Sequence, residues 1–195
     1  MRGRHGNHLS FPRNYFSPFS AIYDHVFEKP IPDAISGLQH LTYLSIMASH
    51  LVGSLPAALF NLTLLRGIKL LGNHFSGPIP DDISKLSRLT FLGLADNLLS
   101  GPIPDALSHL GELWTLNLGG NLFTGSIPSV ISTITTLRLL TLEKNRFSGA
   151  IPDWISTVAR LRSLYVVVSL YVCLTAMSVG LHLRIAQPVA GQQWR

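Results

Sequence analysis

Cysteine is almost missing from the chain, which holds a single one, Cys173, among 195 residues. A disulfide framework within the chain and a zinc site of the Cys-x-x-Cys type are therefore excluded. Charged residues are also few, at 13% of the sequence against the roughly 25% of an average soluble domain. Hydrophobic residues reach 47%, which is too much for a chain that is disordered throughout. The composition therefore predicts one folded domain with a large apolar core.

Acidic residues are absent before Asp24, whereas Arg2, Arg4 and Arg13 lie in that first stretch. Of the net charge of +5, these three arginines supply +3, and the rest of the chain is close to neutral. No helix face or ribbon of the sequence collects Lys and Arg, so no nucleic acid is expected as a partner. Residues 1–30 contain no apolar run of about 7–15 residues, so no secretory signal peptide is expected within them.

What the chain has in abundance is internal repetition with a step of 24 residues. The tetrapeptide G-x-[IL]-P occurs five times in one frame, starting at Gly53, Gly77, Gly101, Gly125 and Gly149. Apolar residues keep the same step, in columns that start at Leu41, Leu44, Ile46, Leu51 and Leu55. A polar column begins with Ser49 and continues through Asn73, Asn97, Asn121 and Asn145. Self-similarity at this period is typical of solenoid proteins.

The residue types of the repeat have physical reasons. Apolar residues alternate in segments such as Leu92-Gly93-Leu94, so a short strand would place both leucines on one face. The column of asparagines is expected to be a structural ladder, because an amide can satisfy backbone donors and acceptors where the chain bends. One repeat cannot bury its own apolar stripe, so the core is expected to form by stacking. The aspartates that follow the I-P pairs are expected to cap short helical turns, namely Asp81, Asp82, Asp105 and Asp153.

The unit resembles the plant-type leucine-rich repeat, L-x-x-L-x-L-x-x-N-x-[LF]-x-G-x-I-P-x-x-[LI], and the copy from Leu89 to Leu110 matches it throughout. The resemblance covers residues 31–166 or so. It implies an α/β repeat fold, a right-handed leucine-rich-repeat solenoid. Short parallel strands would line its concave face, and 3-10 or short helical turns its convex side.

Both ends of the chain depart from the repeat. The predicted parts are a disordered tail over 1–18, a solenoid with degenerate first and last repeats over 19–166, an apolar segment over 167–183 and a short tail over 184–195. Between Leu164 and Leu183 there is no Asp, Glu, Lys or Arg, and a bilayer span needs about 20 apolar residues. Three interpretations of 164–183 stay open: a transmembrane helix, a degenerate capping repeat, and a sequence artefact.

The resemblance also implies where a ligand would bind, because the residues between the leucines of each strand would point out from the concave face. Aromatic side chains in such a groove are frequent hot spots of binding. The expected ligand-binding residues are Tyr43 and Phe91, with Lys69, Asn117, Glu143 and Lys144 as polar partners. Asn61 lies in the single N-x-[ST] sequon, on the predicted convex side, and is expected to carry a glycan if the chain is secreted.

Motifs of catalysis are missing, since the sequence has no H-E-x-x-H, no G-x-S-x-G and no P-loop. His50 and His74 lie one repeat apart and could share a metal ion, but a surface pair without metal is the favoured interpretation. The chain is therefore expected not to be an enzyme, and no metal site and no cofactor are expected.

The resemblance implies recognition of a protein or peptide ligand on the concave face, with a co-receptor as a further partner. The chain would be a fragment of a receptor-like protein or receptor-like kinase ectodomain, in signalling or defence. It would lie at the cell membrane or outside the cell if a signal peptide precedes it. Two alternatives stay open: a soluble inhibitor of a microbial wall-degrading enzyme, similar to the polygalacturonase-inhibiting proteins, and a truncated product without independent function.

Overall fold

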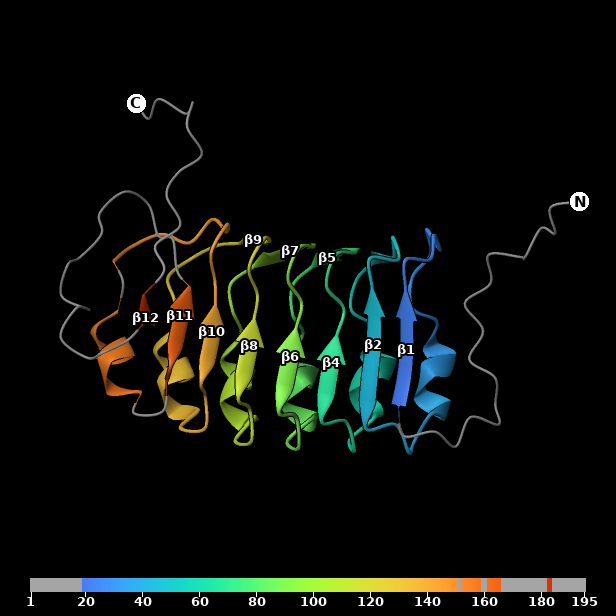
Figure 1. Cartoon of the computed structure of the whole chain (residues 1–195), viewed down its shortest axis with the longest axis horizontal. Helices are drawn as coiled ribbons and strands as arrows, with labels where there is room; N and C mark the ends of the chain where they lie inside the picture. The colour runs from blue at the N-terminus through green and yellow to red at the C-terminus, as the bar shows by residue number, and fades with distance from the viewer. Residues whose placement is uncertain (1–18, 151, 159–160, 166–181, 184–195) are drawn as a thin grey trace, which may run out of the picture.

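The computed structural model describes residues 19–150, 152–158, 161–165 and 182–183. In this part of the chain each repeat forms one coil of a solenoid (Figure 1). The strands of successive coils lie side by side on one face, and the 3-10 turns lie behind them (Figure 1). The structure confirms the predicted right-handed repeat solenoid, with parallel strands on its concave face and 3-10 turns on its convex side.

Within the described residues, a parallel sheet of eight strands forms the concave face. In spatial order the strands are β1 (Phe19–Tyr23), β2 (Tyr43–Met47), β4 (Gly67–Lys69), β6 (Phe91–Gly93), β8 (Thr115–Asn117), β10 (Leu139–Thr141), β11 (Ser163–Tyr165) and β12 (His182–Leu183). From β1 to β11 each residue pairs with the one 24 positions further along, as Leu44 does with Ile68. Because the pairing step equals the sequence repeat, equivalent residues form rows across the sheet.

A second parallel sheet lies along the edge where the strands of the first sheet end (Figure 1). Its strands, in the part of the chain that the structure describes, are β3 (Val52–Gly53), β5 (His74–Gly77), β7 (Leu98–Gly101) and β9 (Leu122–Phe123). Each of these strands follows the turn that leaves the first sheet. The glycine of the G-x-[IL]-P motif sits at or just after this strand, and Gly101 has a φ of +82° there, which glycine adopts without steric cost.

Short 3-10 helices return the chain along the convex side. In the described residues they are η1 (Asp33–Gly37), η2 (Ala57–Asn61), η3 (Asp81–Lys85), η4 (Asp105–His109), η5 (Ser129–Thr133) and η6 (Asp153–Thr157). The expectation that aspartates cap these turns is wrong. The proline of each I-P pair already occupies the N-cap position, so the aspartates fall inside the first turn, and no N-cap of these six helices makes a side-chain capping bond.

The core fills the space between the concave sheet and the 3-10 helices. Its inward-facing strand residues, such as Leu92 and Leu94, are at most 1% exposed, and Phe75 and Phe123 are fully buried. The Phe123 ring stacks on that of Phe147 in the next coil, with 6.4 Å between centroids. Burial of one such side chain is worth about 1.5–3 kcal/mol, and neighbouring coils supply the contacts that achieve it.

Buried asparagines join successive coils at the turn that follows each strand. Asn97 is 5% exposed, and its Oδ1 accepts a hydrogen bond from the backbone N–H of Phe75 in the preceding coil at 3.0 Å. Its Nδ2 donates to the carbonyl oxygens of Leu70, Leu94 and Ala95 at 2.9–3.1 Å. The same pattern occurs at Asn73, Asn121 and Asn145.

The residue before each of these asparagines has a left-handed backbone, and so do its equivalents in the first two coils. This column has φ between +49° and +67° and consists of Asp24, Ala48, Gly72, Asp96, Gly120 and Lys144. Glycine reaches this region freely and aspartate at modest cost, whereas Ala48 and Lys144 carry steric strain there. The sequence pattern predicts an outward-facing position for Lys144 but does not reveal this backbone requirement.

Glycine in place of Ala48 is expected to raise the free energy of unfolding by about 0.5–1 kcal/mol, because it relieves the strain of φ +49°. Urea denaturation of the two proteins measures the change. The matched control is Ala57→Gly, at the exposed first residue of η2, where the same replacement is expected to cost about 0.5–1 kcal/mol. If Ala48→Gly and Ala57→Gly lower the free energy of unfolding by the same amount, the prediction is wrong.

Several predicted parts of the chain lie outside the described residues: the disordered tail over 1–18, the short tail over 184–195, and most of the apolar segment, residues 166–181. Of the 164–183 segment, Leu164 and Tyr165 belong to β11, and His182–Leu183 form β12, which pairs with β11. The described residues contain no helix with the length and apolar character needed to cross a bilayer.

Candidate functional site

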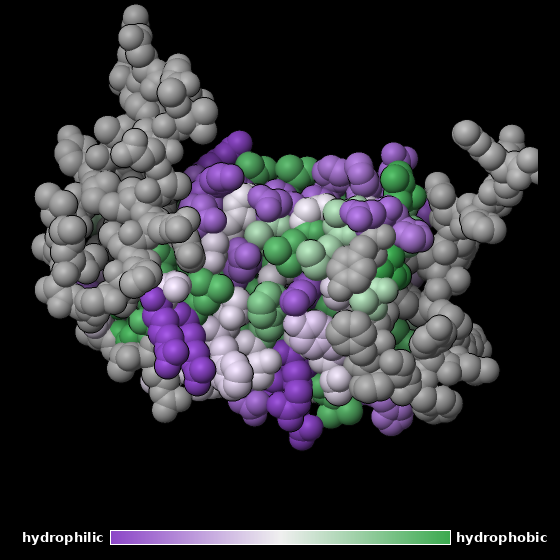
Figure 2. Space-filling model, viewed as in Figure 1, coloured by the Kyte–Doolittle hydropathy of each residue, from purple (hydrophilic) through white to green (hydrophobic). Residues whose placement is uncertain are grey.

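The outward positions of the concave sheet form rows across the strands, because the pairing step equals the sequence repeat. Tyr43, Gly67 and Phe91 are paired across β2, β4 and β6, and the next outward row contains Lys69 and Gly93. Figure 2 shows that weakly polar and apolar atoms gather over the middle of this face, with hydrophilic atoms along its edges. The concave face therefore offers an apolar floor with polar margins.

Three of the predicted residues meet in this floor. The Nζ of Lys69 lies 5.6 Å from the centroid of the Tyr43 ring and 5.1 Å from that of Phe91, so one ammonium group contacts two aromatic rings. Both distances fall within the range of attractive cation–π contacts. All three side chains are half-buried. We refer to Tyr43, Lys69 and Phe91 as the aromatic–lysine patch.

Two glycines make room for the rings of the patch. A Cβ atom at Gly67 would collide with the Tyr43 ring, whose Cζ would be 2.6 Å away. At Gly93 the Cβ would lie 2.7 Å from Cε1 of Phe91 and 2.9 Å from Cδ1 of Leu71. Real Cβ contacts are not that short, so each ring rests on a glycine backbone, in space that any other residue at Gly67 or Gly93 would fill.

The other three predicted residues lie further along the sheet, at β8 and β10. Asn117 accepts a hydrogen bond through Oδ1 from the N–H of Gly119 at 3.3 Å. The Glu143 side chain lies above the same glycine, and its Oε2 is buried without a hydrogen-bond partner among the described residues. Burial raises the pKa of Glu143, and the nearby Asp96 adds to this, while the adjacent Lys144 opposes it. This group is polar and acidic, in contrast to the aromatic–lysine patch.

A cluster that the sequence pattern does not predict lies at the edge where the strands begin. Trp114 is 50% exposed there, and the guanidinium carbon of Arg138 lies 4.8 Å from its ring centroid. Arg66, Arg88 and Arg162 precede neighbouring strands at the same edge. Arginines therefore gather along one edge of the sheet, although no helix face or ribbon of the sequence collects Lys and Arg. Residues 22–24 positions apart in the sequence become neighbours once the coils stack, although nothing in the linear sequence groups them.

Asn61 and the histidine pair lie away from the concave floor. Asn61 is exposed at the end of η2, on the convex side. The rings of His50 and His74 are 5.2 Å apart between centroids and tilted by 56°. In the described residues, no group of three or more His, Cys, Asp or Glu side chains is arranged to hold a metal ion.

The coil geometry, the asparagine ladder and the G-x-[IL]-P turns together define a leucine-rich-repeat solenoid. The family model described as Leucine Rich Repeat matches residues 88–110, 112–134 and 136–158. A search of curated proteins gave no match. The chain belongs to the leucine-rich-repeat proteins of the plant type.

Solved structures of plant receptors resemble the chain over most of its length. The Arabidopsis receptor kinase HAESA, in complex with the peptide hormone IDA and the co-receptor SERK1, is 36% identical over 70% of this chain and 23% of its own, with a TM-score of 0.66. PEPR1 in a PEPR1-AtPEP1 structure is 32% identical over 77% and 21%, with a TM-score of 0.73. The leucine-rich-repeat ectodomain of SOBIR1 from Arabidopsis thaliana is 35% identical over 63% and 67%, with a TM-score of 0.58.

The chain spans less than a quarter of HAESA and of PEPR1, and about two thirds of the SOBIR1 ectodomain. Its repeats and these neighbours support a role in ligand or protein recognition in a receptor-like context.

Proposed function

We propose that this chain is a non-catalytic recognition module that binds a peptide ligand on its concave face. The observation that carries the proposal is the aromatic–lysine patch. Its two rings are half-buried and rest on glycine backbones, so little side-chain entropy is lost when a ligand covers them. Rigid aromatic side chains of this kind are the commonest anchors of protein interfaces.

The similar structures support a receptor-like setting for this role. HAESA was solved with a peptide hormone and a co-receptor, and the SOBIR1 structure is the ectodomain of a receptor kinase. By analogy, the chain is a piece of a receptor-like protein in signalling or defence, located outside the cell or at the membrane, and a co-receptor completes its complex. The inhibitor of a wall-degrading enzyme and the truncated product remain alternative predictions.

Loss of the patch is expected to abolish most of the peptide affinity. Peptides selected from a random library by their binding to the protein are the probe, and titration calorimetry gives the dissociation constants. The double variant with Tyr43→Ala and Phe91→Ala is expected to bind them about 30-fold more weakly, which corresponds to a hot-spot loss of about 2 kcal/mol.

The control for this experiment is Leu98→Ala. Leu98 is 46% exposed in β7 of the second sheet, so its truncation removes a similar apolar surface away from the concave face. Its affinity for the peptides is expected to stay within about twofold of the parent protein. A double variant that binds as tightly as the control would overturn the proposed function.

A glycan on Asn61 is expected when the chain is produced through the secretory pathway, because the sequon side chain is exposed. Glycosidase treatment would then increase the electrophoretic mobility of the protein, and Asn61→Gln would remove this shift. Since η2 lies on the convex side, the sugar would leave the concave face open, and peptide affinity is expected to be unchanged. Asn117→Gln, which is outside any sequon, is the control and keeps the shift.

A further inference from the structure

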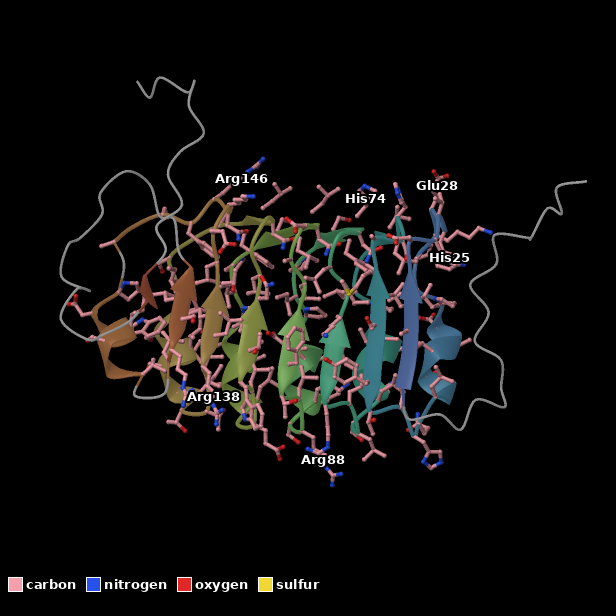
Figure 3. The ribbon with its side chains drawn as sticks, viewed as in Figure 1. His25, Glu28, His74, Arg88, Arg138 and Arg146 are labelled. Carbon is pink, nitrogen blue, oxygen red and sulfur yellow. The ribbon has the colours of Figure 1, made fainter. Side chains whose placement is uncertain are left out.

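Four exposed arginines line the edge at which the strands of the concave sheet begin. We call this edge the entry rim, made of Arg66, Arg88, Glu112, Trp114, Arg138 and Arg162. Figure 3 labels Arg88 and Arg138 on this edge, opposite His74 and Arg146 on the other. Backbone bonds of 2.8 Å run from Arg138 N to Trp114 O and from Arg162 N to Arg138 O. Adjacent strands are about 4.8 Å apart, so Trp114, Arg138 and Arg162 form a continuous row, and Arg88 and Glu112 lie two positions before the same row in their own coils.

The positive charge of the entry rim is poorly neutralised. Arg66 and Glu112 form an ion pair of 3.5 Å in which both side chains are 54% exposed, and such surface pairs are weak. Among the described residues, Arg88 and Arg162 have no ion-pair partner. Four arginines against one glutamate leave the rim with a net charge of +3. Aspartates are instead concentrated in the 3-10 helices of the convex side, such as η3 and η4.

The entry rim borders the aromatic–lysine patch directly. The carbonyl of Arg66 accepts a hydrogen bond from the N–H of Phe91 at 3.1 Å, so patch and rim residues are neighbours in the backbone itself. A ligand that lies on the patch therefore lies next to Arg66. Guanidinium groups bind carboxylates bidentately, and the guanidinium of Arg138 also lies against the ring of Trp114.

We propose that the entry rim binds acidic side chains of the same peptide ligand, which is therefore an acidic, amphipathic peptide. The inference rests on the proposed function, because the patch must anchor the apolar side chains of that peptide. A nucleic acid or an anionic polysaccharide would satisfy the arginines but has no apolar side chains for the rings of Tyr43 and Phe91. The combination of an apolar floor with a basic margin favours a peptide.

Fluorescence anisotropy of labelled synthetic peptides tests this inference on the whole chain. The probes are a peptide of alternating Glu and Leu, the same peptide with Ser in place of Glu, and polygalacturonate as competitor. The Glu peptide is expected to bind about tenfold more tightly than the Ser peptide, and to lose this advantage in about 0.5 M NaCl. Removing the two rim charges beside the patch in the double variant R66Q/R88Q is expected to remove most of the advantage.

Arg146→Gln is the matched control, because it removes an exposed arginine from the opposite edge. Its affinity for the Glu peptide is expected to remain unchanged. The two substituted rim arginines are exposed, so the double variant is expected to have the melting temperature of the parent protein. An unchanged melting temperature shows that the variant retains the fold.

The outcomes separate the two proposals. If the Tyr43→Ala and Phe91→Ala changes weaken both peptides while the rim variant binds like the parent, the proposed function stands and the acidic ligand is wrong. If the Tyr43→Ala and Phe91→Ala changes weaken the binding of neither peptide, or if neither peptide binds the parent protein, both proposals are wrong. Rim-dependent binding of polygalacturonate that displaces no peptide would assign the arginines to a polysaccharide and overturn the inference.

Discussion

Alanine in place of Asn97 is expected to lower the melting temperature of the protein by roughly 10 °C. The buried N–H of Phe75 would lose its acceptor, which costs about 1–3 kcal/mol. The three bonds donated to Leu70, Leu94 and Ala95 would be lost as well, at about 0.5–1.5 kcal/mol each. Each of these carbonyls keeps a second donor, so the lower value applies to each of the three bonds, and the total loss is about 2.5–4.5 kcal/mol.

Thermal unfolding followed by circular dichroism measures this effect, and Asn117→Ala is its control. Asn117 is half-buried in β8, and its amide makes one bond of 3.3 Å within its own coil. Its replacement is expected to cost no more than about 1 kcal/mol. Similar melting temperatures for the two variants would mean that the backbone groups around Asn97 find other partners, and the ladder would then not stabilise the solenoid.

Valine in place of Gly120 is expected to reduce the free energy of unfolding by about 3 kcal/mol. The backbone there has a φ of +65°, a region that a β-branched residue adopts only under strain. The new Cβ would also collide with the Asp96 carboxylate and lie 3.2 Å from the Asp96 backbone nitrogen. Urea denaturation, with the midpoint and slope fitted together, measures the loss.

Two further glycines separate the causes of this loss. Gly72 has nearly the same backbone, with φ +67°, but its Cβ would meet Ala48 at an ordinary distance of 3.6 Å. Gly72→Val is therefore expected to lower the free energy of unfolding less than Gly120→Val does. Gly111 has open space around its Cβ position and no left-handed backbone, so Gly111→Val is expected to change stability by less than about 0.5 kcal/mol. A Gly120 variant as stable as the Gly111 variant would contradict the prediction.

The sequence predicts the coil architecture well because one physical requirement is repeated at every step. Columns such as Leu44, Ile68 and Leu92 must face inward for any coil to bury its apolar stripe, and the structure pairs these residues. The sequence predicts the local backbone geometry less well than the coil architecture. Asp81 has the residue type of a cap but falls one position too late, because Pro80 takes the N-cap. The left-handed column was hidden by Ala48 and Lys144, which are unusual residues for that geometry.

The patch could be anticipated in part because Tyr43, Lys69 and Phe91 stand on consecutive strands at outward positions. Their mutual contact depends on Gly67 and Gly93, whose lack of a side chain lets the rings tilt onto the sheet. No composition rule reveals that arrangement. The entry rim escaped prediction because its arginines are distant in sequence, and only the stacking of coils places Arg138 beside Arg162.

The asparagine ladder has a consequence for how such a chain can change in length. The carbonyl of Leu70 accepts from both Asn73 and Asn97, and that of Leu94 from both Asn97 and Asn121, so every junction between these coils uses the same bonds. A recombination event that removes 24 residues between equivalent positions would join Asp96 to Asn121 and recreate an existing junction. Recombination between equivalent positions can therefore lengthen or shorten the concave face one coil at a time, without a new interface between coils.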